Sequence, residues 1–186
     1  MNIKSLNKTL SSKWLDEGKI LVHPTESIWG LGCDAFNKKA VQKIFLLKKR
    51  NANKSFILLS SSVENVQKFT MPLKNKDKNF IDNYWPGPFT LLLKYNDKLP
   101  SHLKNETGKV AFRVSNHLPI VNLFKAYKGF MVSTSANISG QENMNDPREI
   151  INYFKDTDLA FYDSNLGKSK KPSTIIDLET RNIIRS

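Results

Sequence analysis

Hydroxyl and amide side chains are concentrated in the segment STSANISG, residues 133–140, directly after the apolar residues 130–132. Serine, threonine and asparagine supply many small hydrogen-bonding groups, and Gly140 lets the chain turn. A loop of this composition at the end of a strand is typical of sites that bind phosphate or carboxylate groups. The segment therefore predicts an anion-binding loop.

A second polar segment, HPTESIWGLG, runs from His23 to Gly32. Pro24 stops the preceding strand, and the Thr-Glu-Ser that follows resembles the first turn of a helix, where backbone N–H groups are unpaired. Gly30 and Gly32 let the backbone approach a ligand or a neighbouring strand closely. An ordinary helix cap is the alternative interpretation.

Cations are clustered in the segment that contains Lys48, Arg50 and Lys54. Lysine as a point charge and arginine as a planar fork suit different oxygens of one polyphosphate. No acidic residue occurs between Asp34 and Glu64, although a solvated helix face normally mixes both signs. The alternative is the end of a helix, where cations favour the helix dipole.

Two further segments place polar groups on or before strands. Arg113 lies among apolar residues in VAFRV, which is costly unless the guanidinium meets a carboxylate or a phosphate. Ser173 precedes an apolar strand in PSTIID. An internal salt bridge is the alternative for Arg113, and an ordinary turn is the alternative for Ser173.

Helices and strands that alternate along the chain must position these segments. Strands are expected at residues 19–23, 56–59, 89–93, 110–114, 130–132, 160–162, 174–176 and 183–184. Helices are expected at residues 3–14, from 37 to 48, at 63–69, in the lysine-rich stretch before Trp85, after Pro119 and after Pro147. Because the later strands are closely spaced, the predicted fold is a single α/β domain, residues 1–186, with a twisted mixed sheet.

The chain has 29 basic and 17 acidic residues among 186, which gives a net charge of +12. A polyanion such as RNA, or an anionic substrate such as ATP, would account for this excess. Only five of the basic residues are arginine, so a codon bias toward lysine and asparagine is the alternative cause.

Several classes of protein are disfavoured by what the sequence lacks. No apolar run approaches the ~20 residues of a membrane span, and no signal-like segment follows the first lysines, so the cytoplasm is the expected location. Cys33 is the only cysteine and the three histidines lack ligand spacing, so no metal site is expected. The absence of G-x-S-x-G, G-x-x-x-x-G-K-[ST] and G-x-G-x-x-G argues against a serine hydrolase and against familiar nucleotide-binding loops.

Six segments together resemble the YrdC-like family, in particular its single-domain TsaC-type threonylcarbamoyl-AMP synthases. They are HPTESIWGLG, the K-x-R of Lys48 and Arg50 with Lys54, WPGPFTLLL, VAFRV, VSTSANISG and PSTIIDL. They occur in the family's order from His23 to the end of the sequence, so the resemblance covers nearly the whole chain. It implies an open, strongly twisted α/β sheet with a large basic concave cavity.

The resemblance also implies a reaction in which L-threonine, bicarbonate and ATP give threonylcarbamoyl-adenylate and pyrophosphate. This is the first step toward threonylcarbamoyladenosine beside the tRNA anticodon, and a separate transferase complex would use the product. ATP would enter with Mg²⁺, and no tightly bound cofactor or dedicated metal cage is expected. Since three anions must be held together, catalysis should rest on positioning and electrostatics.

Roles for individual residues follow from the family motifs. Catalysis and binding of the ATP phosphates are expected from Lys48, Arg50, Ser135 and Asn137, and the first two side chains are expected to meet ligand and not the core. Threonine would be held by Thr25, Arg113, Ser133 and Ser173, with Arg113 as the carboxylate fork. Further ATP contacts are expected from Lys54, Lys109, Asn143 and Arg185.

The sequence departs from the family pattern at four positions. Asn51 and Ser55 stand where prolines are usual, and Ser27 and Trp29 replace threonine and tyrosine. We therefore expect a less rigid loop after Arg50 without loss of activity. The sequence ends at Ser186, so the single-domain form is expected.

Two alternative functions remain. A non-catalytic module that binds tRNA or double-stranded RNA would also suit a basic cavity, and its binding would weaken steeply with salt. The other is a carbamoyl-transfer module like that of hydrogenase maturation, although this chain lacks the zinc-finger cysteines and the acylphosphatase segment of such proteins.

Overall fold

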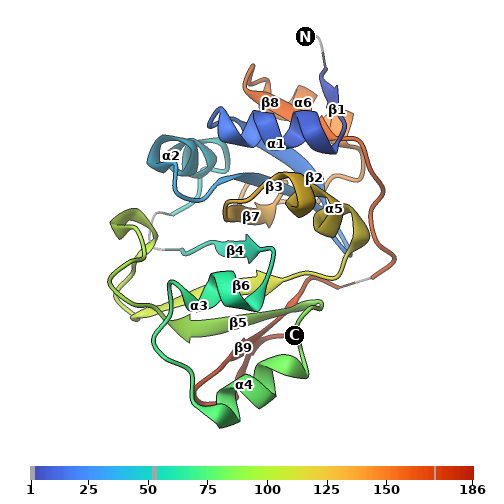
Figure 1. The fold of residues 1–186 in the computed structure, drawn as a ribbon. Helices are drawn as coiled ribbons and strands as arrows, with labels where there is room; N and C mark the ends of the chain where they lie inside the picture. Colours follow the sequence, from blue (N-terminus) through green and yellow to red (C-terminus); the bar gives the residue numbers. More distant parts are fainter. Residues whose placement is uncertain (1–2, 52–53, 170) are drawn as a thin grey trace.

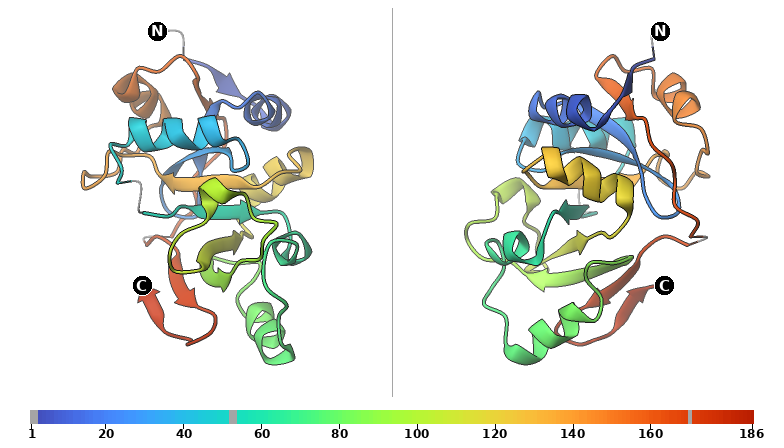
Figure 2. Two further views of the ribbon diagram at one scale, coloured as in Figure 1. Left: turned by 90° about the vertical axis from the view of Figure 1, so that its left-hand side faces the viewer. Right: turned by 45° about the vertical axis from the view of Figure 1, so that its right-hand side comes forward.

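The computed structural model describes residues 3–51, 54–169 and 171–186. In this part of the chain, ten strands form one sheet in the order β1-β8-β2-β3-β7-β4-β6-β5-β9-β10 (Figure 1). Their bounds are Ser5–Leu6 (β1), Ile20–Pro24 (β2), Trp29–Asp34 (β3), Ile57–Ser60 (β4), Phe89–Lys94 (β5), Lys109–Val114 (β6), Met131–Ser135 (β7), Leu159–Tyr162 (β8), Thr174–Asp177 (β9) and Ile183–Arg185 (β10). Parallel and antiparallel pairs both occur, so the predicted mixed α/β sheet is confirmed. At the red end of the chain, β9 lies at a steep angle to the central strands (Figure 2).

Helices flank this sheet, as expected. They are α1 (Lys8–Asp16), α2 (Lys38–Leu47), α3 (Val63–Gln67), α4 (Asn75–Asp82), α5 (Leu118–Ala126) and α6 (Pro147–Phe154), with a short 3₁₀ helix at Ser101–Leu103. Helix α2 begins where the sequence predicts, because the Asn37 side chain accepts a hydrogen bond from the Ala40 N–H at 3.1 Å.

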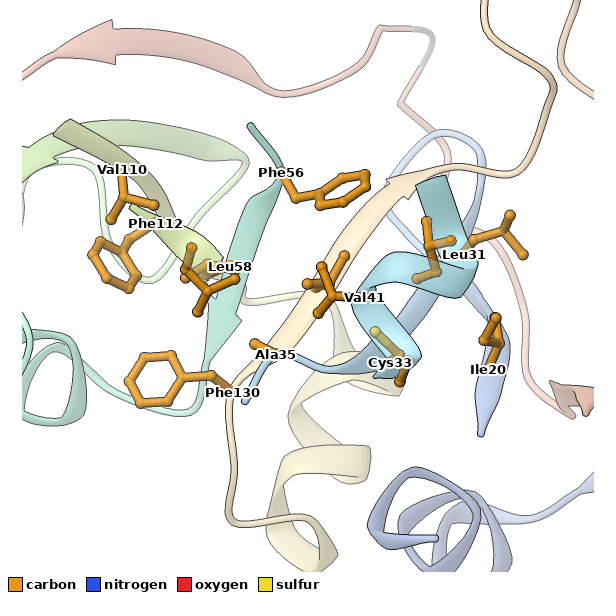
Figure 3. Close-up of a cluster of buried hydrophobic side chains, with 14 of the residues drawn as sticks. Ile20, Leu31, Cys33, Ala35, Val41, Phe56, Leu58, Val110, Phe112 and Phe130 are labelled. Atoms are coloured by element: carbon orange, nitrogen blue, oxygen red, sulfur yellow. The ribbon is translucent and has the colours of Figure 1, made fainter. Parts of the chain in front are cut away.

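The main core is formed by apolar side chains of β2, β3, β4 and β6 together with α2 (Figure 3). Leu31, Leu58 and Phe112 are at most 1% exposed there. A second cluster joins α1 and α5 to the sheet through Trp14, Leu123 and other buried residues. Packing in these two clusters fixes the central strands, and the strands in turn position the polar residues at their ends.

The N-terminal helix is shorter than predicted. Residues 5 and 6 form β1, which pairs in parallel with β8, and α1 begins only at Lys8. The Asn7 side chain accepts a hydrogen bond from the Leu10 N–H at 3.0 Å and so caps the helix. A sheet edge and a cap therefore override the helical spacing of Ile3 and Leu6.

The prediction of a helix start after Pro24 is wrong. Residues 25–28 form a turn between the antiparallel strands β2 and β3, and the sequence did not reveal β3 at all. Two glycines in WGLGCD disguise this strand, since glycine is normally depleted in strands. The polar segment at 133–140 also differs from expectation, because β7 continues through Ser135.

The pairing register of the strands aligns one row of residues across five neighbouring strands. Gly32 pairs with Ser133, Ser133 with Ile57, Ile57 with Ala111, and Ala111 with Leu92. Directly paired residues point to the same face of a sheet, as do residues two apart along one strand. Ser135 and Arg113, two positions beyond Ser133 and Ala111, therefore share this face with them.

Candidate functional site

A cavity of about 430 Å³ lies over this face of the sheet. Its walls come from the turn at residues 25–28, from Arg50 and residues 55–57, from residues 133–137 and from the C-terminal segments around 173 and 185. Nine of the twelve predicted site residues line it: Thr25, Arg50, Arg113, Ser133, Ser135, Asn137, Asn143, Ser173 and Arg185. The fold thus brings together most of a site whose members are widely separated in sequence.

The charged side chains among the described residues that line the cavity are all arginines. Arg50, Arg113 and Arg185 line it, and the described lining residues include no aspartate or glutamate. Burial lowers the pKa of all three guanidinium groups, and the charge of Arg113 lowers that of Arg185 further. An anionic ligand would favour the charged forms, so the cavity suits anions.

Arg113 is held by a buried ion pair with Glu26. Their side chains are 8% and 15% exposed, and the Glu26 carboxylate also accepts a hydrogen bond from the Ser115 hydroxyl at 2.6 Å. The Arg113 Nε donates to the Gly87 carbonyl at 3.3 Å. The guanidinium is therefore pre-oriented at the cavity wall, and the internal salt bridge considered as an alternative does exist.

Glu26 is a site residue that the sequence does not predict. The signal in the sequence was Arg113 itself, because an arginine among apolar residues on a strand requires an acidic partner. Glu26 lies far from Arg113 in sequence, and the turn that brings it there resembles a helix start in the sequence. Because the local structure of this segment was predicted incorrectly, the pairing of Glu26 with Arg113 could not be predicted either.

Thr25 lines the cavity, but its hydroxyl forms hydrogen bonds within the turn at residues 25–28. Oγ1 donates to the Ile28 carbonyl at 2.7 Å and accepts from the N–H groups of Ser27 and Ile28 at 3.3 and 3.2 Å. One hydroxyl has one donor and two acceptor positions, so these bonds use its full capacity. A direct bond from Thr25 Oγ1 to a ligand would require one of them to open.

Two serines lie at opposite sides of the cavity with buried polar partners. The Ser133 hydroxyl is 3.3 Å from Nε2 of His23, which is fully buried and whose pKa burial lowers to about 4. The Ser173 hydroxyl is 2.9 Å from the Thr90 hydroxyl, and Arg185 Nη2 donates to the Ser173 carbonyl at 2.8 Å. His23 is therefore a neutral packing residue beneath the site at neutral pH.

Gly30 is needed beside this histidine. A Cβ at position 30 would lie 2.6 Å from His23 Nε2 and 2.7 Å from Cε1. We expect Gly30→Ala to destabilise the protein by about 1–3 kcal/mol, which is typical of overpacking, as measured by denaturant unfolding. The cost should be smaller in a His23→Ala background, since the clash is then removed. An equal cost in both backgrounds would contradict this explanation.

Ser135 and Asn137 form a small ordered loop. The Ser135 hydroxyl donates to Asn137 Oδ1 at 2.7 Å, and Asn137 Nδ2 donates to the Gln141 carbonyl at 2.5 Å. The Ala136 N–H donates to the Trp29 carbonyl at 2.9 Å. Both predicted side chains reach the cavity on this loop.

Lys48 lies behind the loop and does not line the cavity. Its side chain is among the largest fully buried ones, at 1% exposure, and Nζ donates to the carbonyls of Ser135 and Asn137. The expectation that this side chain avoids the interior is therefore wrong. Helix α2 ends at Leu47, and its periodicity places residue 48 near the same face as Val41 and Ile44, which are buried as well.

Two other predicted cations also lie away from the cavity. Lys54 is exposed, and only its carbonyl approaches the site, as acceptor for Arg50 Nε at 3.2 Å. Lys109 Nζ is 2.7 Å from Asp177 and 3.1 Å from Glu179, so its charge is balanced outside the cavity. The intervening Ala52 and Asn53 lie outside the described residues.

Neither a metal cage nor a membrane span is found in the described part of the chain. Residues 3–51, 54–169 and 171–186 contain no group of three or more His, Cys, Asp or Glu that could hold a metal ion. Within the same ranges, no helix combines the length and apolar character needed to cross a membrane.

Comparison with known proteins places this geometry in a family. The Sua5/YciO/YrdC family model, described as "Telomere recombination", matches residues 13–186. A protein of Acinetobacter baumannii named threonylcarbamoyl-AMP synthase is 38% identical over 183 residues, which cover 95% of this chain and 96% of that protein. A protein of the same name from Buchnera aphidicola is also 38% identical, over 92% of this chain and 98% of its own length.

Solved structures show the same fold. E. coli YciO superposes with a TM-score of 0.84 at 25% identity and covers 99% of this chain and 93% of its own. A variant of P. abyssi Sua5 has a TM-score of 0.84 at 27% identity, and this chain spans 52% of its length. The resemblance inferred from six short motifs is thus confirmed over nearly the full length, and the chain belongs to the Sua5/YciO/YrdC family.

Proposed function

We propose that this chain is an L-threonylcarbamoyladenylate synthase, which joins L-threonine, bicarbonate and ATP and releases pyrophosphate. The observation that carries the proposal is the cavity itself. Three arginines converge there with serine and asparagine side chains, with no acidic residue among the described lining residues. Relatives of nearly equal length with 38% identity bear the name of this activity.

The reaction explains why such a cavity is needed. The threonine amine attacks bicarbonate to form an N–C bond, and loss of water leaves a carbamate. A carbamate oxygen then attacks the α-phosphorus of ATP, and the bond to the bridging oxygen breaks as pyrophosphate leaves. Carboxylate, carbamate and triphosphate repel one another, so cations must hold them in line.

Threonine is proposed to bind where Arg113 is fixed. A guanidinium can pair with a carboxylate through two parallel hydrogen bonds, and Arg113 is already oriented by Glu26 and Gly87. Ser133 and Ser173 line the same cavity and can accept or donate to the substrate hydroxyl and amine. Thr25 would contribute chiefly by shaping the turn.

ATP is proposed to bind between Arg50, Arg185 and the loop that carries Ser135 and Asn137, with Asn143 nearby. The transfer of the adenylyl group would make the enzyme a nucleotidyltransferase. Magnesium would enter as the ATP complex, because the described cavity lining supplies no carboxylate to hold a resident ion. Lys54 and Lys109 would influence the nucleotide only at longer range.

The product would be consumed by a separate transferase complex that modifies tRNA, in the cytoplasm. A module that only binds RNA would not require the buried Arg113–Glu26 pair or the serines of the cavity. The catalytic proposal accounts for both features, and direct contact with tRNA or double-stranded RNA remains compatible with it.

The test is pyrophosphate release by the purified chain. We expect release from ATP only when L-threonine and bicarbonate are both present, with threonylcarbamoyl-adenylate found by mass spectrometry. L-threonine should be replaced by L-valine as a matched control, because valine has a methyl group in place of the hydroxyl. Release that is independent of the amino acid, or absent from the folded protein, would refute the proposal.

A further inference from the structure

The chain that follows β8 crosses most of the sheet before it reaches β9. In the sheet order, β2, β3, β7, β4, β6 and β5 lie between these two strands. The connection runs along the right-hand side of the molecule in Figure 1. Residues 163–169, here called the crossing segment, form its first part, and Pro172 and Ser173 at its far end line the cavity. The connection therefore leads directly into the cavity wall.

Two backbone hydrogen bonds join the crossing segment to the turn at residues 25–28. The Gly167 N–H donates to the Thr25 carbonyl at 2.9 Å, and the Ser169 N–H donates to the Glu26 carbonyl at 2.8 Å. Both acceptors belong to the turn that connects β2 with β3. The main chain of this turn is thus fixed by a segment that lies more than 130 residues later in the sequence.

Gly167 approaches the turn more closely than any side chain would allow. A Cβ at position 167 would lie 2.5 Å from the Glu26 carbonyl oxygen, 2.6 Å from its Cα and 2.8 Å from its carbonyl carbon. All three atoms belong to the backbone, so no rotation of a side chain could relieve the contact. Glycine is therefore required at position 167 for the crossing segment to pack on Glu26 in this way.

The residue held by this packing, Glu26, orients the arginine of the cavity. Its carboxylate pairs with Arg113 and accepts a hydrogen bond from the Ser115 hydroxyl at 2.6 Å. That hydroxyl also accepts from the His117 N–H at 3.0 Å, and His117 Nε2 lies 3.2 Å from the Asn165 carbonyl. The crossing segment thus contacts the main chain of Glu26 and, through His117, the serine that binds its side chain.

We propose that Gly167 is a positioning residue for the amino-acid part of the cavity. Because it packs on Glu26 without a side chain, it determines where the Glu26 carboxylate lies and where the Arg113 guanidinium points. Gly167 is not among the described residues that line the cavity, so it acts on a substrate only through the turn. The identity of the ligand as L-threonine rests on the proposed function, whereas the link from Gly167 to the Arg113–Glu26 pair does not.

The first test compares Gly167→Ala with Asn165→Ala. We expect Gly167→Ala to raise the KM for L-threonine by about tenfold, as partial loss of a hydrogen bond to a charged group predicts, while the KM for ATP changes by less than about twofold. Asn165→Ala removes an exposed side chain of the same segment and keeps the carbonyl near His117, so it should change neither constant. An unchanged KM for L-threonine in folded Gly167→Ala, or equal increases in both constants, would overturn the proposal.

A double-mutant cycle tests the link without any substrate. Gly167→Ala is introduced into the wild-type protein and into the paired variant Arg113→Met with Glu26→Gln, and unfolding is followed in denaturant. If Gly167 acts through the ion pair, its replacement should change the unfolding equilibrium constant at least about threefold less in the paired variant. Equal changes in both backgrounds would show that Gly167 only supports the fold, which would overturn the proposal. A failure of the proposed function would appear separately, as absent pyrophosphate release.

Amide hydrogen exchange of the wild-type protein needs no variant to fold. Bound ligand suppresses an opening that releases it, so L-threonine at ten times its Kd should slow exchange of the Gly167 and Ser169 amides by about tenfold. Amides of α4, which contributes no residue to the described cavity lining, should exchange at an unchanged rate. Unchanged exchange at Gly167 and Ser169, with L-threonine binding verified by calorimetry, would overturn the proposal.

Discussion

Replacing Arg50 with alanine is expected to lower threonylcarbamoyl-adenylate formation by about 100-fold or more, the usual cost of removing a donor that stabilises transition-state charge. Arg50 is half-buried at the cavity, where Nη2 donates to the Ser55 carbonyl at 2.8 Å and the guanidinium lies 5.0 Å from the centre of the Phe56 ring. These contacts fix the fork and use only part of its donor capacity. Pyrophosphate release at saturating L-threonine measures the effect.

The matched variant for this position is Arg50→Lys. Lysine keeps the positive charge but cannot form two parallel bonds, so it should recover only part of the activity. Thermal unfolding should change little in either variant, because Arg50 is not part of the core. Wild-type turnover in Arg50→Ala would show that this residue does not touch the reacting nucleotide.

Replacing Arg113 with alanine is expected to raise the KM for L-threonine by about 10- to 100-fold, while the KM for ATP changes much less. Hydrogen bonds to charged groups are worth about 1.5–3 kcal/mol, which corresponds to this range. The prediction follows from the position of Arg113 on β6, where it lines the cavity on the same face of the sheet as Ser133. Initial rates at varied threonine and fixed ATP, and the reverse, separate the two constants.

This variant also leaves a carboxylate without its partner. Glu26 would be buried beside a cavity, and breaking a buried pair costs about 3–5 kcal/mol of stability. The paired variant Arg113→Met with Glu26→Gln removes both charges and should recover much of that stability, but it should not restore threonine affinity. Equal increases in both KM values, or recovery of threonine affinity in the paired variant, would assign Arg113 a structural role.

The sequence predicted most of the sheet, because strands such as β4 (Ile57–Ser60) and β6 (Lys109–Val114) contain the short apolar runs predicted at 56–59 and 110–114. It missed β3, since Gly30 and Gly32 remove the strand signal. Those glycines are present for a tertiary reason, the buried His23 ring on the neighbouring strand. A local sequence pattern carries no information about a side chain that comes into contact only in the folded protein.

Several polar residues that the sequence places on or next to the central strands line the cavity. Ser133, Arg113 and Ser173 reach the cavity as expected. Lys48 and Lys109 do not, because the direction of a long side chain depends on helix ends and on acids elsewhere, here Asp177. Sequence identifies which residues are charged, but only the assembled sheet determines which of those charges face the ligand.

The position of β1 has a consequence for the kinetics of folding. Its partner is β8, and Ser5 pairs with Phe161, so the paired residues are 156 positions apart (161 − 5). During synthesis the first strand must wait until most of the chain has emerged, and closing so large a loop costs entropy before the pairing repays it. The pairing of β2 with β8 is also distant in sequence, since Ile20 and its partner Leu159 are 139 positions apart (159 − 20). We therefore expect the edge of the sheet formed by β1 and β8 to be completed only after β8 has been synthesised.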